Sequence, residues 1–112
     1  MADPQYTLLL VDDNPDNLDM LGRRLRKKGY KILSAASGRE ALQTMAKEPV
    51  DLVILDVMMP EMNGFEVAQI LKQKTETSEI PIIFLTAQSI SISQFDPGNT
   101  ITANLMLFAL YL

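Results

Sequence analysis

Short apolar runs alternate with amphipathic segments along most of the chain. Each run is bounded by charged or turn-forming residues, which is typical of strands buried on both faces of a parallel sheet. Four runs fit this description: residues 6–11, 30–35, the run that stops at Asp56, and residues 80–87. The pattern therefore predicts four strands before residue 88.

The segment after the first run has the spacing and the end signals of a helix. Asn14 or Asp13 can cap it, with Pro15 at its first helical position. Leucines then recur at helical spacing, and Gly29 follows a basic last turn as a C-terminal cap. We therefore predict one amphipathic helix between the first two strands.

Two further helices are predicted in the same way. Ser37 and Glu40 have the spacing of a capping box, so a second helix should open there and end before Pro49. The third helix should begin at Asn63, in the segment NGFEVAQILKQK. Strict alternation of strands and helices predicts an α/β fold with a doubly wound parallel sheet and helices on both faces.

Polar side chains end three of the predicted strands: Asp12 and Asp13 the first, Asp56 the third and Thr86 the fourth. Each has an ordinary interpretation, as a helix cap, a loop start or a strand end. If these strands are neighbours, however, their carboxyl ends meet where α/β sheets bind ligands. Clustered carboxylates repel one another unless a cation lies between them, and such oxygen ligands favour Mg²⁺.

Composition narrows the chemistry further. The 112 residues carry a net charge of −4, so no basic surface predicts direct nucleic-acid binding, and the basic cluster at 23–28 is interpreted as a solvated helix face. The chain has neither Cys nor His, which excludes disulfides, thiol nucleophiles and Ser-His-Asp triads. The first residues do not resemble a signal peptide, and the apolar segment 101–112 is too short to span a bilayer. We therefore expect a soluble, cytoplasmic protein without membrane contact.

Three motifs together resemble the receiver domain of two-component response regulators: LLLVDDNPDN, LVILDVMMPEMNGFEV and IPIIFLTA. The resemblance covers residues 5–87 and implies a flavodoxin-like, CheY-like sheet of order 2-1-3-4-5. It also implies that residues 1–112 form a single receiver-like domain with a divergent tail at 88–112.

The resemblance assigns roles to the strand-end residues. It implies that Asp56 is the phospho-acceptor, taking phosphate from a sensor histidine kinase or a phosphotransfer protein. Asp12, Asp13, Asp56 and the backbone carbonyl of Met58 would bind Mg²⁺, and Thr86 would be the switch hydroxyl. The domain would then be a signalling phosphoacceptor in a phosphorelay, not an enzyme acting on other substrates.

Loop residues near Asp56 add two expectations. Pro60 and Gly64 should shape the loop that keeps the site open, Gly64 by lacking a Cβ. The apolar side chain of Met58 would not orient a hydrolytic water, which predicts a long-lived phosphoryl group.

The tail departs from the receiver pattern. No Lys or Arg follows Lys74, so the family's phosphate-binding Lys has no counterpart, and Asp96 is the only charged residue after position 87. The last strand and helix should be atypical or missing, although residues 104–112 could form a fifth strand. We therefore expect incomplete cover on one face of the sheet and a tendency to homo-oligomerise or exchange strands. One hypothesis for the change is an altered reading frame or a truncation near Ala87.

The sequence leaves three alternatives to a switching receiver. The main alternative is a degenerate or truncated receiver that acts as a non-switching protein-interaction or assembly module. A phosphatase of the haloacid dehalogenase type also uses a strand-end Asp with Mg²⁺, but it requires a second Asp where Met58 stands. A nucleotide-binding domain is disfavoured because neither a P-loop nor a GxGxxG motif is present.

Overall fold

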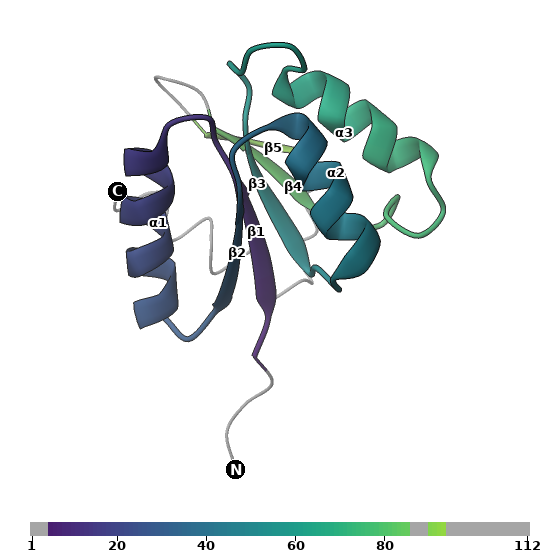
Figure 1. Cartoon of the computed structure of the whole chain (residues 1–112). Helices are drawn as coiled ribbons and strands as arrows, with labels where there is room; N and C mark the ends of the chain where they lie inside the picture. Colours follow the sequence, from purple (N-terminus) through teal and green to yellow (C-terminus); the bar gives the residue numbers. More distant parts are fainter. Residues whose placement is uncertain (1–4, 86–89, 94–112) are drawn as a thin grey trace.

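The computed structural model describes residues 5–85 and 90–93. A five-stranded sheet lies at its centre (Figure 1). Its strand order is β2-β1-β3-β4-β5. The first four strands run parallel to one another, with Leu10 opposite Ile54 and Ile54 opposite Ile83. The strands are β1 (Thr7–Val11), β2 (Lys31–Ala35), β3 (Leu52–Asp56), β4 (Ile82–Leu85) and β5 (Ile90–Ser93). The predicted parallel order 2-1-3-4 is therefore confirmed.

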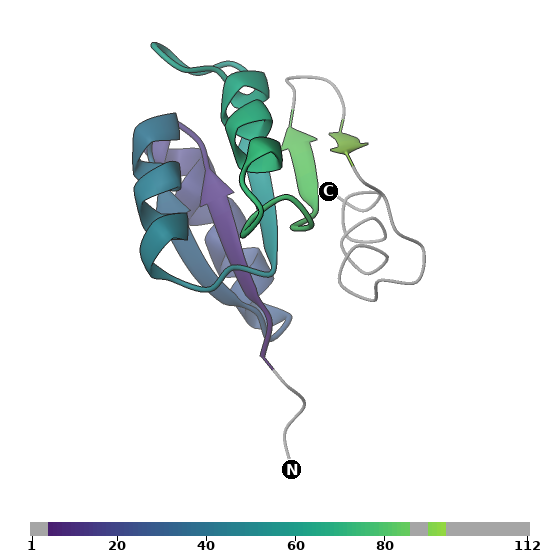
Figure 2. The same cartoon turned by 90° about the vertical axis from the view of Figure 1, so that its right-hand side faces the viewer.

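The fifth strand differs from the parallel strand that the fold class implies. β5 runs antiparallel to β4, with Ile90 opposite Leu85, and lies beyond β4 in Figure 2. A parallel partner would need a crossover connection of a dozen or more residues, and only residues 86–89 separate β4 from β5. The segment 104–112, which we expected to offer a fifth strand, lies outside the described residues.

Three helices connect the parallel strands: α1 (Pro15–Lys27), α2 (Gly38–Lys47) and α3 (Gly64–Gln73). Each begins where a helix start was predicted, with Asn14, Ser37 and Asn63 as the caps. Pro15 occupies the first position of α1, where its missing N–H costs no hydrogen bond. All three predicted helices are thus confirmed, and none of the described helices is long and apolar enough to cross a bilayer.

The capping box predicted at the start of α2 forms only in part. The Ser37 hydroxyl accepts a hydrogen bond from the Glu40 N–H at 3.2 Å. The Glu40 carboxylate, however, accepts from the N–H of Ala36 and not from that of Ser37. Of the three described helices, α3 has both halves of the box, because Asn63 and Glu66 bond reciprocally.

The helices bury both faces of the sheet, α1 on one side and α2 with α3 on the other (Figure 1). Successive residues of β1 therefore belong to different cores. Leu8 and Leu10 pack with the α1 side chains, while Leu9 and Val11 pack with those of α2 and α3. All four are at most 1% exposed. This two-sided burial explains why the strand is apolar at consecutive positions and does not alternate.

We expected one face of the sheet to lack part of its cover. α1 is the helix on that face among the described residues, yet Ile54 and Ile83, which point to the same side, are only 7% and 4% exposed. The expectation is therefore wrong at these two positions. Self-association and strand exchange stay predictions.

Candidate functional site

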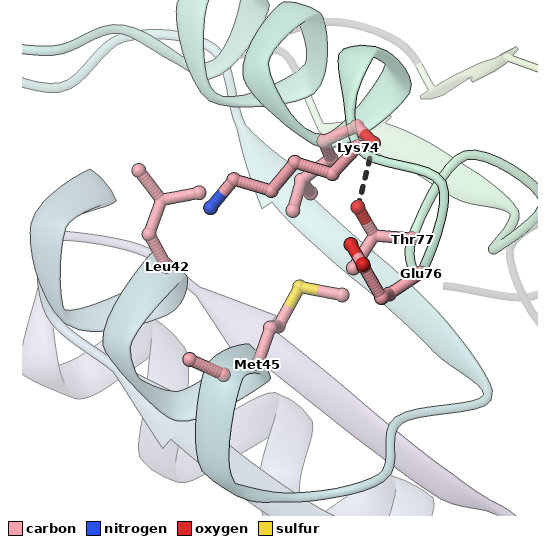
Figure 3. Close-up of a pocket in the computed structure, with 7 residues that line it drawn as sticks. Leu42, Met45, Lys74, Glu76 and Thr77 are labelled. Atoms are coloured by element: carbon pink, nitrogen blue, oxygen red, sulfur yellow. Dashed lines mark hydrogen bonds between the residues drawn. The ribbon is translucent and has the colours of Figure 1, made fainter.

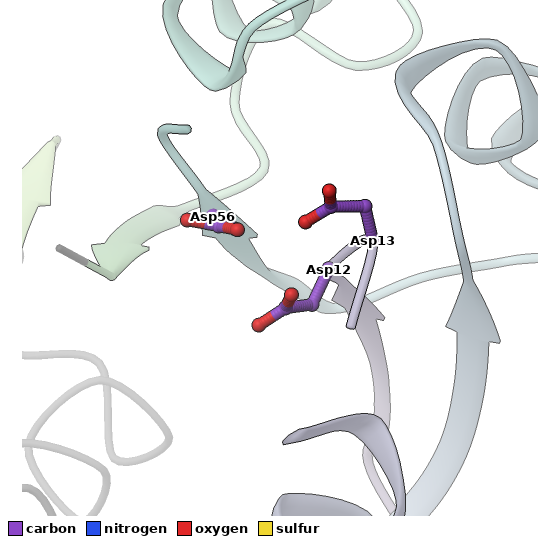
Figure 4. Close-up of side chains that lie close together, drawn as sticks. All are labelled: Asp12, Asp13 and Asp56. Carbon is purple, nitrogen blue, oxygen red and sulfur yellow. The ribbon is translucent and has the colours of Figure 1, made fainter. Parts of the chain in front are cut away.

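The three predicted carboxylates lie together at the carboxyl edge of the sheet. Asp12 and Asp13 follow β1, and Asp56 is the last residue of β3, the strand beside β1 (Figure 4). One carboxylate oxygen from each residue lies within 4.8 Å of those from the other two. Because parallel strands end at the same edge, the pairing of β1 with β3 produces this cluster.

Asp12 is the buried member of the cluster, with only 5% of its surface exposed. Its Oδ1 accepts a hydrogen bond from the backbone N–H of Asn14 at 2.9 Å. Its Oδ2 accepts from the side-chain amide of Asn17 at 3.1 Å. Its backbone N–H donates to the carbonyl of Ala35, the last residue of β2, at 3.1 Å. The first turn of α1 and the end of β2 therefore fix both the backbone and the carboxylate.

Asp56 is only half-buried and is held less firmly. Its Oδ1 accepts a hydrogen bond from the backbone N–H of Met58 at 3.1 Å. Partial burial raises the pKa of the Asp56 carboxyl above its usual value of 3.8, and the negative charges of Asp12 and Asp13 raise this pKa further, while the Met58 N–H opposes them. The ionised cluster is thus electrostatically unfavourable on its own.

The loop between β3 and α3 brings the start of α3 against the acidic strand end. The Gly64 N–H donates to the carbonyl of Val57 at 3.0 Å. A Cβ on Gly64 would collide with the backbone carbonyl of Asp56 and would approach Val57 Cα to 3.0 Å. The predicted need for a residue without a Cβ is therefore explained by backbone contact, since neither carbonyl nor Cα can move aside easily.

The same loop contains a left-handed residue that is not glycine. Glu61 has a φ of 67°, and a hydrogen bond of 2.7 Å runs across it from the N–H of Met62 to the carbonyl of Pro60. A three-residue turn with positive φ at its centre is rare and strained. Pro60 thus belongs to the tight turn of this loop, close in sequence to Asp56.

Two of the expected site residues stay less defined. The side chain of Met58 is 76% exposed, and the residue contacts the cluster through its N–H, so a role for its carbonyl oxygen stays a prediction. Thr86 lies outside the described residues.

Asn17, by contrast, was missed by the sequence reasoning. Its place one helical turn after the Asp-Asp pair is the signal that could have revealed it.

A pocket of about 260 Å³ lies elsewhere, between the second half of α2 and the end of α3 (Figure 3). Leu42, Met45 and Leu71 line it, with Lys74 and Thr77 at its margin. The Thr77 hydroxyl donates to the carbonyl of Leu71 at 2.6 Å and so is already satisfied. The helix ends here lead to the amino ends of the strands, so this pocket is separate from the carboxylates.

The donor set suits a hard divalent cation. The three carboxylates supply only oxygen atoms, and their spacing allows one ion to contact all of them. Mg²⁺ usually binds one or two carboxylates together with several waters, and the exposed position of Asp13 leaves access for water. A cation would also offset the repulsion that raises the pKa of Asp56.

Comparison with known families agrees with this geometry. The model of the response regulator receiver domain matches residues 8–96. The chain belongs to this family. Membership places this receiver domain in two-component signalling, whose receivers typically serve as signalling phosphoacceptors. The match begins in β1 and continues past Ala87, so it includes the described β5.

The curated relatives are longer than this chain. The chain is 47% identical over 85 residues to a probable cyclic di-GMP phosphodiesterase of Vibrio cholerae, covering 76% of this chain and 19% of that protein. The chain spans between 19% and 37% of the length of five curated relatives that it matches. The shared part is therefore one domain of longer proteins.

Solved structures confirm the receiver fold. The chemotaxis protein CheY4 of Vibrio cholerae is 29% identical with a TM-score of 0.76, covering 94% of this chain and 98% of that chain. The response regulator TrrA of Thermotoga maritima, in complex with Mg²⁺-BeF, is 40% identical with a TM-score of 0.71, covering 76% and 72%. An acidic triad of this kind is typical of the Mg²⁺ site of receivers.

Proposed function

We propose that this receiver domain accepts a phosphoryl group on Asp56 in a two-component phosphorelay. The observation that carries the proposal is the meeting of Asp12, Asp13 and Asp56 at one edge of the sheet. Asp56 suits the role of acceptor because it is more accessible than Asp12 and has a less constrained carboxylate. The receiver family, whose members partner with histidine kinases, supports the same reading.

The chemical step is an in-line displacement at phosphorus. A carboxylate oxygen of Asp56 forms a bond to the phosphorus of a phosphohistidine, and the bond from phosphorus to the imidazole nitrogen breaks. The electron pair of that bond stays with the imidazole, so the product is an acyl phosphate on Asp56 and a free histidine on the donor. The donor is a sensor histidine kinase or a phosphotransfer protein.

Asp12, Asp13, Asp56 and the backbone carbonyl of Met58 would hold Mg²⁺. When bound, the ion neutralises the negative charge on the phosphoryl oxygens in the transition state. Asp12 provides a fixed ligand because both of its oxygens are hydrogen-bonded to the start of α1. Thr86, which follows Leu85 at the end of β4 in the sequence, is proposed as the switch hydroxyl.

Two further proposals concern lifetime and extent. The apolar, exposed side chain of Met58 offers no group to orient a hydrolytic water, so the aspartyl phosphate should be long-lived. The domain should comprise residues 1–112, with 5–87 carrying the family pattern and 88–112 divergent. We expect it to function in the cytoplasm, without direct contact to nucleic acid or membrane.

A second function is favoured by one observation. Residues 75–112 contain no Lys or Arg, so the phosphate-binding Lys of the family has no counterpart among them. The chain could therefore retain the acidic pocket while acting as a non-switching interaction or assembly module. In that case Mg²⁺ binds, but phosphorylation is slow or does not propagate to the rest of the domain.

Acetyl phosphate with Mg²⁺ separates the two functions. Intact-mass spectrometry should show one phosphoryl adduct in the wild type and in Asp19→Asn, a control in an exposed ion pair of α1. Asp56→Asn should show none. NMR shifts that spread from Asp56 to Thr86 would support a switch, and an adduct without spreading shifts would support the non-switching module. An adduct that persists in Asp56→Asn would contradict the proposed acceptor.

A further inference from the structure

The side chain at the third helical position has a different hydrogen-bond partner in each of the three helices. The third helical residue of α3, Glu66, returns to the N–H of its cap residue Asn63. The third residue of α2, Glu40, returns to the N–H of Ala36. Both acidic side chains thus satisfy backbone donors that precede their own helices, which is the usual use of this position.

The third residue of α1 does something else. Asn17 occupies this position, and its amide donates to Asp12 Oδ2 at 3.1 Å. It is not needed for capping, because the N–H of the cap residue Asn14 already donates to Asp12 Oδ1. Among the described residues this is the one hydrogen bond of the Asn17 side chain. Its partner is a carboxylate of the acidic cluster.

The direction of the hydrogen bond between Asn17 and Asp12 follows from the chemistry of the two groups. An ionised carboxylate can only accept hydrogen bonds, so the nitrogen of the Asn17 amide must face Asp12. A carboxylate that is bonded at one oxygen only can still rotate about its Cβ–Cγ bond. Donors at both oxygens, Asn14 and Asn17, restrict that rotation and leave the remaining lone pairs for a ligand. A Glu at this position would repel Asp12.

We propose that Asn17 is a positioning residue for Mg²⁺ binding, which orients the Asp12 carboxylate from the first turn of α1. This inference rests on the metal site of the proposed function and adds a residue to it. Hydrogen bonds to metal ligands typically change metal affinity by about 10- to 100-fold when they are removed. We expect the lower end of that range, about tenfold, because Asn14 still holds one oxygen of Asp12.

Mg²⁺ titration of the protein, followed by isothermal calorimetry or NMR, tests the proposal without any phosphodonor. Asn17→Ala removes the donor and replaces it with the best helix former, while Asn17→Leu removes the donor at similar size. Both should raise the Kd for Mg²⁺ about tenfold with little change in the thermal midpoint. Asn17→Gln, which keeps an amide, should bind more tightly than either, and Met20→Ala, exposed on the same helix, should match the wild type.

A structural role alone would change the thermal midpoint and leave the affinity unaltered. The proposal is overturned if both Asn17→Ala and Asn17→Leu bind Mg²⁺ within twofold of the wild type. A second measurement is the rate of modification by acetyl phosphate. Asn17→Ala should be modified more slowly than the wild type at low Mg²⁺, and this difference should shrink as Mg²⁺ is raised to saturation. A wild type that binds Mg²⁺ without forming an adduct would refute the acceptor role of Asp56 only. A wild type that binds no Mg²⁺ would refute the positioning role as well.

Discussion

Asp12 directly follows β1 and Asp56 ends the neighbouring strand β3, yet the two carboxylates are held in opposite ways. Asp12 is 5% exposed and accepts a hydrogen bond at each oxygen, one from the cap residue and one from the first turn of α1. Asp56 is half-buried and accepts one hydrogen bond from the described residues, from the N–H of Met58. Similar apolar strands therefore deliver one constrained carboxylate and one accessible carboxylate.

The difference follows from what comes after each strand. After β1 the chain enters α1 almost at once, so helix donors reach Asp12. After β3 a longer loop intervenes, and α3 approaches the backbone of Asp56 through Gly64 without donating to its carboxylate. A phosphoacceptor site needs both a fixed metal ligand and an accessible reactive oxygen. Substitutions at and around the two aspartates test whether Asp12 and Asp56 divide these roles.

The largest effect is expected from Gly64→Ala. The new Cβ would collide with the carbonyl of Asp56, and overpacking against backbone should lower the free energy of unfolding by about 3 kcal/mol. Modification by acetyl phosphate should fall as well, because the acceptor strand end shifts. Gly22→Ala in α1 is the control. Its Cβ would meet only the flexible end of Arg26, so stability should rise by up to about 1 kcal/mol. Urea unfolding measures both, and equal stabilities would contradict the close approach.

Asp12→Ala should destabilise the domain because it removes the acceptor for two donors at the start of α1. The free energy of unfolding should fall by about 1–2 kcal/mol, the scale of two lost hydrogen bonds partly offset by reduced charge repulsion. Asp19→Ala, which breaks an ion pair with both partners mostly exposed, should change it by less than about 0.5 kcal/mol. If the two variants were equally stable in urea, Asp12 would not be the anchored member of the pair.

Asp56→Asn should stabilise the metal-free protein, whereas Asp12→Ala destabilises it. Because its pKa is raised in the folded state, ionised Asp56 destabilises the fold. The free energy of unfolding of the wild type should therefore fall as the pH rises from below 3.8 through the raised pKa. At pH 7 the variant should therefore be more stable, by up to about 1 kcal/mol because solvent screens a half-buried charge. The advantage should disappear at pH values below 3.8 and should shrink when Mg²⁺ is added. A constant difference across pH would refute the electrostatic cause.

The smallest effect is expected at Glu61. Its positive φ favours glycine, so Glu61→Gly should raise the free energy of unfolding by about 0.5–1 kcal/mol, the left-handed strain less the entropy of glycine. Glu61→Ala keeps the strain and should show no such gain. Chemical denaturation of the two variants in parallel isolates the backbone contribution, and a gain in Glu61→Ala of equal size would assign it to the side chain instead.

Much of this architecture could be predicted from the sequence because its signals are local. Asn14-Pro15, Ser37 and Asn63 mark helix starts whatever surrounds them, and all three were confirmed. The convergence of Asp12, Asp13 and Asp56 needed one further premise, that the strands are neighbours in a parallel sheet. The receiver motifs and the alternation of elements supplied it.

The remaining features depend on three-dimensional contacts that no local pattern records. The hydrogen bond from Asn17 to Asp12 arises because α1 starts beside the strand end, and an Asn at a third helical position normally carries no such meaning. The expected lack of cover on one face of the sheet was inferred from a missing charged helix and not from packing, and the burial of Ile54 and Ile83 contradicts it at those two positions. The antiparallel direction of β5 likewise depends on how the chain leaves β4.

The pocket between α2 and α3 has a practical consequence for following this domain in solution. It lies at the edge of the sheet away from the carboxylates, and the chain contains no cysteine. A Met45→Cys substitution would therefore create a single thiol in the pocket for a fluorescent label. Such a label would not touch Asp12, Asp13 or Asp56, so a change in its emission on phosphorylation would report motion transmitted through the helical layer.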